Sequence, residues 1–248
     1  MLANSSLRHQ KGVSLIELMV GMTIGLIIVA AAGSIYITAL RGGTDATRSA
    51  KLNMELRGAM DTMVSEIRRA GYLHTTTSTD TTANPFMQAT SNLSTPSASC
   101  VLFAYDADQS GAINTADFFG FKQNGDAISM RSGGTALPTT SDGCEVSTDS
   151  WEKITDDNNV VVDTLSFTNT VTTPDDMFQC WNTSTNASET ASCKAGETVY
   201  EDATAGTRLV ETRSISVALT GHHKADPLTK ISLTQQVRVR NDKILVKP

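Results

Sequence analysis

The sequence VSLIELMVGMTIGLIIVAAAGSIYITAL, residues 13–40, decides the architecture of the amino-terminal part of this chain. Its 28 residues contain a single charged side chain, Glu17, and the next charge along the chain is Arg41. A helix rises about 1.5 Å per residue, so roughly 20 apolar residues cross the hydrocarbon core of a bilayer. The stretch therefore predicts a membrane-spanning helix.

The residues before this stretch predict its orientation. Arg8 and Lys11 precede the apolar residues, and no acidic residue accompanies them. Because positive charges stay on the cytoplasmic side, we expect a cytoplasmic amino end and an exported region after Arg41. A cleaved secretory signal is one alternative, but the apolar stretch exceeds the usual core of about 7–15 residues and no small-x-small site follows it. A plain single-span anchor is the other alternative.

The junction Lys11-Gly12-Val13-Ser14-Leu15-Ile16-Glu17-Leu18 resembles the type III signal of type IV prepilins. The shared features are a short basic leader that ends in Gly, a gap of four residues, a Glu and a long apolar helix. The resemblance implies that a prepilin peptidase cleaves between Gly12 and Val13, so that Glu17 becomes the fifth residue of the mature chain. It also implies N-methylation of the new amino terminus, where the family usually has Phe and this chain has Val13.

Glu17 is a carboxylate within the predicted membrane helix. An unpaired carboxylate in a bilayer costs several kcal/mol, so such a residue is a functional candidate. The expected partner is the α-amino group that cleavage creates at Val13, in the same or a neighbouring subunit, because a nearby cation recovers much of that cost. The resemblance implies that this contact draws an incoming subunit into register with the filament. A carboxylate that merely reaches interfacial water is the alternative.

Apolar residues continue at helical spacing beyond the membrane segment. They recur every three or four residues, at Leu52, Leu56, Met60, Met63, Val64 and Ile67. Charged residues lie between them, as is typical of an amphipathic helix with one buried face. We expect the helix to run from Val13 to Ala70 and to stop at Gly71. Arg68 and Arg69 suit the carbonyl end of its dipole.

The segment Glu66-Ile67-Arg68-Arg69-Ala70-Gly71-Tyr72 resembles the helix end of minor pilins of the PilW type. The resemblance implies a low-copy subunit that joins other minor pilins and the major pilin in a complex that primes assembly near the filament tip. It also implies a single-pass inner-membrane protein with a periplasmic head before assembly, and an extracellular pilus afterwards. A minor pseudopilin of a type II secretion system shares the leader, the Glu and the fold, and is the alternative.

The rest of the chain is expected to form a head rich in β-strands. After a polar connector from His74 to about Ser99, strand-like runs occur at Val101–Tyr105, Phe118–Lys122, Ala127–Arg131, Val160–Phe167, Ser214–Thr220 and Lys230–Val239. The last two alternate apolar and polar residues, and Gly221 to Pro227 predicts a hairpin loop that contains His222 and His223. No segment with helical periodicity separates the runs, so the sheet should be largely antiparallel.

These elements predict an α+β, pilin-like fold. The expected organisation is a leader peptide (1–12), a transmembrane and assembly helix (13–40), its amphipathic continuation (41–71) and a globular extracytoplasmic head (72–248).

All four cysteines, Cys100, Cys144, Cys180 and Cys193, lie in the expected exported region. An even number of cysteines in an oxidising compartment indicates disulfides, and three connectivities are open. We favour Cys100–Cys144 with Cys180–Cys193, because sequential pairing closes the shorter loops. Zinc is the alternative, but the chain has no CxxC pair and the two adjacent histidines have no companion at ligand spacing.

Residues 106–117, DADQSGAINTAD, have the oxygen spacing of an EF-hand loop. Oxygen-bearing side chains occupy positions 1, 3, 5, 9 and 12, and these are Asp106, Asp108, Ser110, Asn114 and Asp117. The spacing predicts a weak, structural Ca2+ site. Position 12 is Asp instead of the longer Glu and the flanks are strand-like, so a polar turn is the alternative.

Composition and motifs exclude two broad classes of function. The net charge is −6 and no basic stripe occurs, so nucleic acid is not an expected partner. GxSxG, HExxH and phosphate-loop motifs are missing, and the four histidines lie in the leader or in polar segments, so we expect a structural subunit and not an enzyme. A pilus-borne adhesin that uses residues 75–206 as its binding surface is a third hypothesis.

Overall fold

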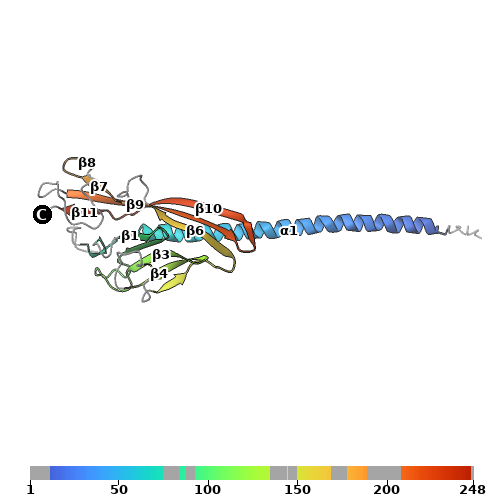
Figure 1. Ribbon diagram of the computed structural model, residues 1–248, viewed down its shortest axis with the longest axis horizontal. Coiled ribbons are helices and arrows are strands. Elements are labelled where there is room, and N and C mark those ends of the chain that lie inside the picture. Colours follow the sequence, from blue (N-terminus) through green and yellow to red (C-terminus); the bar gives the residue numbers. More distant parts are fainter. Residues whose placement is uncertain are drawn as a thin grey trace, which may run out of the picture. The chain divides into compact units, whose positions relative to one another are not determined.

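The computed structural model describes most of the chain. The described residues are 12–74, 84–87, 93–134, 144, 150–168, 178–188 and 208–246. The chain forms two compact units, Met1–Arg48 and Ser49–Pro248. Helix α1, Leu15–Ile67, has 53 residues and contributes to both units (Figure 1).

In the first unit, α1 exposes its apolar side chains. None of the residues in its most apolar window is buried within the structure. Among the described residues, α1 is the one helix that is long and apolar enough to cross a membrane. It begins at Leu15 and not at the predicted Val13, so Gly12, Val13 and Ser14 precede the helix.

In the second unit, α1 buries one face. The buried residues of the helix are Leu52, Leu56, Ala59, Met60, Met63, Val64 and Ile67. They include all six positions that the sequence predicted for this face. The helix ends at Ile67, so the predicted end at Ala70 was wrong by three residues, and Arg68–Gly71 form a turn instead.

Eleven strands and one short 3-10 helix follow in the described residues. They are η2 Pro85–Met87, β1 Ser94–Ser97, β2 Cys100–Ala104, β3 Phe118–Asn124, β4 Ala127–Ser132, β5 Trp151–Lys153, β6 Val160–Thr168, β7 Phe178–Asn182, β8 Ala187–Ser188, β9 Arg208–His223, β10 Asp226–Arg238 and β11 Lys243–Val246. Each of the six predicted runs overlaps one of these strands. The sequence did not predict β1, β5, β7, β8 or β11.

The strands form two antiparallel sheets, which confirms the predicted α+β class. The first has the order β1-β2-β3-β4-β5. In the second, the order is β10-β9-β7-β8, and β6 and β11 also pair with β9. The side-chain amide of Gln123 in β3 joins the sheets: it donates to the Val162 carbonyl oxygen at 3.1 Å and accepts from the Leu165 amide at 3.0 Å.

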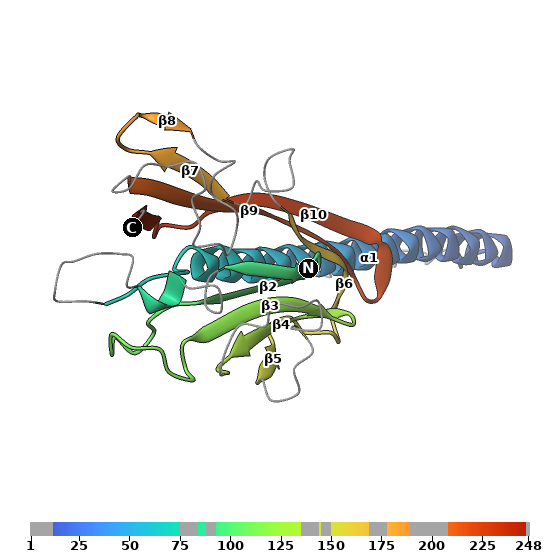
Figure 2. The same cartoon turned by 60° about the vertical axis from the view of Figure 1, so that its left-hand side comes forward.

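The main core lies between these sheets and the buried face of α1. In Figures 1 and 2, β3 and β4 lie on one side of the cyan part of α1, and β9 and β10 lie on the other. Both sheets contribute apolar side chains to the same cluster as the helix, including Phe103, Phe121, Leu165, Val217 and Val237. Burial of a Leu, Met or Phe side chain stabilises a fold by about 1.5–3 kcal/mol, so this interface fixes α1 in the unit.

The β9–β10 connection is shorter than predicted. Only Lys224 and Ala225 form the turn, and both histidines belong to β9. His223 is buried and accepts a hydrogen bond from the Ala225 amide at Nδ1, while His222 Nδ1 lies 2.8 Å from Asp163 Oδ1 in β6. The prediction that these histidines are loop residues was therefore wrong, because pairing with β6 extends β9 through His223.

Candidate functional site

The expected cleavage junction lies at the start of the described chain. Gly12, Val13 and Ser14 are exposed and precede the first turn of α1, and the Ser14 carbonyl oxygen accepts the Leu18 amide at 3.1 Å. A Cβ atom added at Gly12 would meet nothing within 4 Å. The chain itself therefore does not require glycine here for space. The leader residues 1–11 lie outside the described residues.

Glu17 is the acidic residue of the first helical turn. A carboxylate is favoured there because the amino end of a helix carries partial positive charge. Glu17 makes no ion pair with another described residue, and exposed apolar side chains such as Val20, Ile24 and Ile27 follow it along the helix. The structure thus presents a carboxylate in an apolar segment that a cation from outside this fold can approach.

The end of α1 is held by close backbone contacts at Gly71. This glycine has φ +74°, and its amide donates to the Ala104 carbonyl oxygen at 2.8 Å. Its carbonyl oxygen accepts from Asn84 Nδ2 at 3.0 Å. A Cβ atom here would lie 2.8 Å from Arg213 Nη2. Both the backbone conformation and the space therefore select glycine.

Asn241 completes this helix end from the other end of the chain. Its side-chain amide donates to the carbonyl oxygens of Arg69 at 3.2 Å and Ala70 at 3.1 Å. The Arg240 amide donates to the Arg68 carbonyl oxygen at 3.1 Å. These bonds supply partners to the carbonyl groups that follow α1, and the Arg69 carbonyl oxygen also accepts the Tyr72 amide at 2.9 Å. Sequence reasoning identified residues 68–71 but missed Asn241, because no local pattern indicates a contact 172 residues away.

Glu66 forms a partly buried polar contact beside this end. Its Oε2 accepts a 2.5 Å hydrogen bond from the Tyr105 hydroxyl, and its Oε1 lies 3.4 Å from Arg69 Nη1. The Arg69 guanidinium carbon lies 4.2 Å from the centre of the Tyr105 ring. Burial, followed by the bond to Glu66, raises the pKa of Tyr105 far above its usual value of 10.

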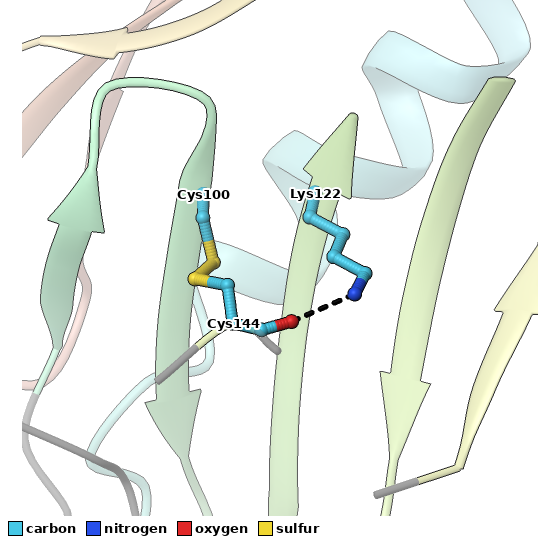
Figure 3. Close-up of a disulfide and its surroundings, with 3 residues drawn as sticks. All are labelled: Cys100, Lys122 and Cys144. Carbon is cyan, nitrogen blue, oxygen red and sulfur yellow. Dashed lines mark hydrogen bonds between the residues drawn. A yellow bond between two sulfur atoms is a disulfide. The ribbon is translucent and has the colours of Figure 1, made fainter. Parts of the chain in front are cut away.

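The Cys100–Cys144 disulfide is present, as predicted. Figure 3 shows that the Cys144 carbonyl oxygen accepts a 2.7 Å hydrogen bond from Lys122 Nζ. The same ammonium group lies 4.5 Å from the centre of the Trp151 ring. Cys180 is also disulfide-bonded. Its predicted partner, Cys193, lies outside the described residues, so that pairing stays a prediction.

The candidate calcium loop joins β2 to β3 and brings three carboxylates together. Ligand oxygens of Asp106, Asp108 and Asp117 all lie within 4.8 Å of one another, a spacing that could hold a cation. Asp106 and Asp117 are buried, and their oxygens accept backbone amides from the loop itself. Asn114 Nδ2 donates to Asp108 at 2.8 Å. The alternative of a polar turn between strands thus also fits this geometry.

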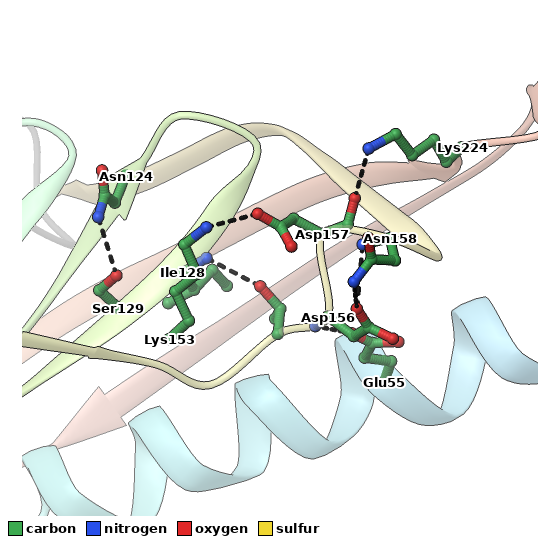
Figure 4. A network of polar contacts seen from close by, with 10 residues as sticks. Glu55, Asn124, Ile128, Ser129, Lys153, Asp156, Asp157, Asn158 and Lys224 are labelled. Atoms are coloured by element: carbon green, nitrogen blue, oxygen red, sulfur yellow. Dashed lines mark hydrogen bonds and ion pairs between the residues drawn. The ribbon is translucent and has the colours of Figure 1, made fainter.

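A second polar network fixes the β5–β6 connection to α1 (Figure 4). Glu55 Oε1 accepts a hydrogen bond from the Asp156 amide. Lys224 Nζ donates to the Asp157 carbonyl oxygen at 2.8 Å, and Lys153 Nζ lies 2.5 Å from Asp157 Oδ2. Burial is the main cause that raises the pKa of Glu55. From the sequence, Glu55 is only one of the charged residues that lie between the apolar positions of the helix.

Two families match this chain. Residues 7–33 match the prokaryotic N-terminal methylation motif, which contains the Gly12–Val13 junction and Glu17. Residues 45–239, more than three quarters of the chain, match prepilin peptidase-dependent protein B. The chain belongs to the prepilin peptidase-dependent protein B family. No curated protein and no solved structure matched it.

Membership of this family agrees with the geometry of the junction. The family name and the methylation motif both imply dependence on prepilin peptidase. The chain is therefore a type IV pilin-type or pseudopilin-type protein, and its apolar helix fits an inner-membrane anchor before assembly.

Proposed function

We propose that this protein is a minor pilin of the type IV pilus. Prepilin peptidase cleaves it after Gly12, and the mature subunit joins other minor pilins and the major pilin in a complex that primes the filament. The observation that carries the proposal is the exposed apolar segment of α1, which has Glu17 as its single acidic residue and lies mostly within the methylation motif of residues 7–33. Such a segment can anchor a subunit in the inner membrane and later pack against other subunits.

The end of the helix supports a minor subunit of the PilW type. Residues 66–72, which resemble that type, form the contacts at Gly71, Glu66 and Arg69 that hold α1 on both sheets. The segment that resembles the PilW type is therefore also the segment that holds α1 against the sheets. In this proposal the head is periplasmic before assembly and lies on an extracellular pilus afterwards. The protein acts as a structural subunit without catalytic activity.

Cleavage is tested with a matched pair of glycine substitutions. Gly12→Val should abolish processing, while Gly33→Val should leave it unchanged. An added side chain has open space at both positions, so neither substitution should disturb the chain itself. A difference in processing between the two variants then reflects recognition by the peptidase. Mass spectrometry of the amino terminus is the measurement. A mature start other than Val13 in the unaltered protein would overturn the assignment.

Assembly is tested at Glu17. Glu17→Ala should still be cleaved but should be lost from sheared filaments, because the carboxylate that pairs with an amino terminus is gone. Thr23→Ala is the control. Thr23 is an exposed residue of the same helix, and its hydroxyl donates to the Val20 carbonyl oxygen one turn earlier. Normal incorporation of the Glu17 variant would contradict the assembly role.

A deletion distinguishes the pilus from a type II secretion system. We expect loss of surface filaments, seen by electron microscopy, with normal secretion of exoproteins. The reverse result would make the protein a minor pseudopilin. Normal filaments with lost adherence would support the adhesin hypothesis instead.

A further inference from the structure

A cleft lined by arginines lies at the end of α1. It has a volume of about 500 Å³, and its lining residues are Ser65, Arg68, Arg69, Tyr72, Gln109, Arg240 and Asn241. Of these seven described residues, three are cationic and none is acidic. The chain as a whole has 26 acidic and 20 basic side chains, so this concentration of positive charge is opposite in sign to the net charge.

Two of the arginines have unused hydrogen-bonding capacity. The side chains of Arg68 and Arg240 make no hydrogen bond or ion pair with any other described residue. A guanidinium carries five N–H donors, and each arginine contributes only its backbone to the contact between them, at 3.1 Å. The cleft therefore offers donors that the fold does not use.

Nearby acids neutralise only part of this charge. Glu66 lies 3.4 Å from Arg69 and also binds Tyr105, while Asp242 pairs with Arg238 at 3.1 Å, outside the cleft lining. The dipole of α1 favours cations after its last turn, which accounts for Arg68 and Arg69. It does not account for Arg240, which comes from the segment after β10 and converges on the same cleft.

We propose that this arginine cleft binds an acidic peptide segment of a partner protein. The planar guanidinium fork matches a carboxylate with two parallel hydrogen bonds, and arginines from separate segments can hold two neighbouring carboxylates. Gln109 adds a side-chain amide that can pair with a peptide backbone. A lipid is a poorer match, because the described lining contains no Leu, Ile, Val or Met side chain and one aromatic ring, that of Tyr72. The inference does not depend on the proposed function in the pilus.

The test measures binding to the full chain in a non-ionic detergent. A fluorescent hexapeptide of alternating Asp and Glu should bind saturably, and affinity should fall as salt rises because the attraction is electrostatic. Arg68→Gln with Arg240→Gln should weaken binding by about tenfold or more, since two charge-assisted contacts are lost. The unfolding midpoint should change little, because neither side chain has a described partner and Arg68 loses only its interaction with the helix dipole.

A matched control and two further probes make the outcome decisive. Arg57→Gln removes an exposed arginine of α1 outside the cleft and should leave peptide affinity unchanged. Inorganic phosphate and phosphatidylglycerol vesicles should compete far less well than the peptide. Equal loss with Arg57→Gln, or displacement by phosphate at the same concentration as the peptide, overturns the proposal. Binding to vesicles but not to peptide overturns it as well.

Discussion

The Tyr105 hydroxyl donates a 2.5 Å hydrogen bond to the Glu66 carboxylate and so joins the residue after β2 to the last turn of α1. Both side chains are largely removed from water, and a hydrogen bond to a charged group contributes about 1.5–3 kcal/mol. Tyr105→Phe should therefore lower the free energy of unfolding by about that amount. Urea unfolding followed by tryptophan fluorescence measures it. Tyr72→Phe, whose hydroxyl lies 3.4 Å from His74 on an exposed surface, should change little; equal effects would contradict the prediction.

Glu55 should make the head less stable as pH rises. Its native pKa lies above its ordinary value of 4.5, mainly because of burial, so the folded chain binds this proton more tightly than the unfolded chain. Glu55→Gln keeps an acceptor for the Asp156 amide but cannot ionise. The stability of the original protein relative to this variant should fall as the pH rises above the ordinary value of 4.5.

Asp157→Asn is the control, because the contribution of Asp157 to stability should change with pH in the opposite direction. The hydrogen bond from Lys153 lowers the pKa of Asp157, so the contribution of this carboxylate is present at neutral pH and is lost as pH falls. Unfolding midpoints measured from about pH 2 to pH 7 compare both variants, because the contribution of Asp157 is lost below its ordinary pKa of 3.8. Parallel profiles for Glu55→Gln and the original protein would show that Glu55 is not desolvated.

Two glycine substitutions should have opposite effects. Gly71→Ala places a methyl group 2.8 Å from Arg213 Nη2 at φ +74°, and the left-handed conformation alone costs about 1–2 kcal/mol for a residue with a side chain. Gly58→Ala adds a methyl group in open space on α1 and should stabilise the helix by up to about 1 kcal/mol. Denaturant unfolding of both variants measures whether the free energy of unfolding falls for Gly71→Ala and rises for Gly58→Ala. A neutral Gly71→Ala would disprove the close approach.

The calcium hypothesis predicts heat on titration with millimolar Ca2+. Asp108 is the informative position, because it is exposed and Asp108→Asn keeps an oxygen that can accept the Ser110 amide. Asp106 and Asp117 are buried and hold backbone amides, so their loss should destabilise the loop with or without an ion. Asp108→Asn should remove the heat and leave the unfolding midpoint in EDTA nearly unchanged. Absence of heat in the original protein would leave only the polar-turn interpretation.

The local sequence predicted the elements with a regular period. Leu52, Leu56 and Ile67 repeat at helical spacing and are all buried, and the alternation in Ser214–Thr220 lies within β9. The first part of β9 was missed because Glu211 and Arg213 occupy buried positions where alternation requires apolar residues. The short strand β5, with three residues, carries too little pattern to predict.

By itself the sequence determined the apolar helix, the Gly12–Val13 junction with Glu17, and the amphipathic face of α1, because each depends on residues close together in the chain. Only the tertiary structure decided how α1 ends, which residues surround it and where the arginine cleft forms. Asn241, Tyr105 and Asn84 reach the segment 66–71 from distant parts of the chain, and such contacts arise from the pairing of strands and helix rather than from any local period.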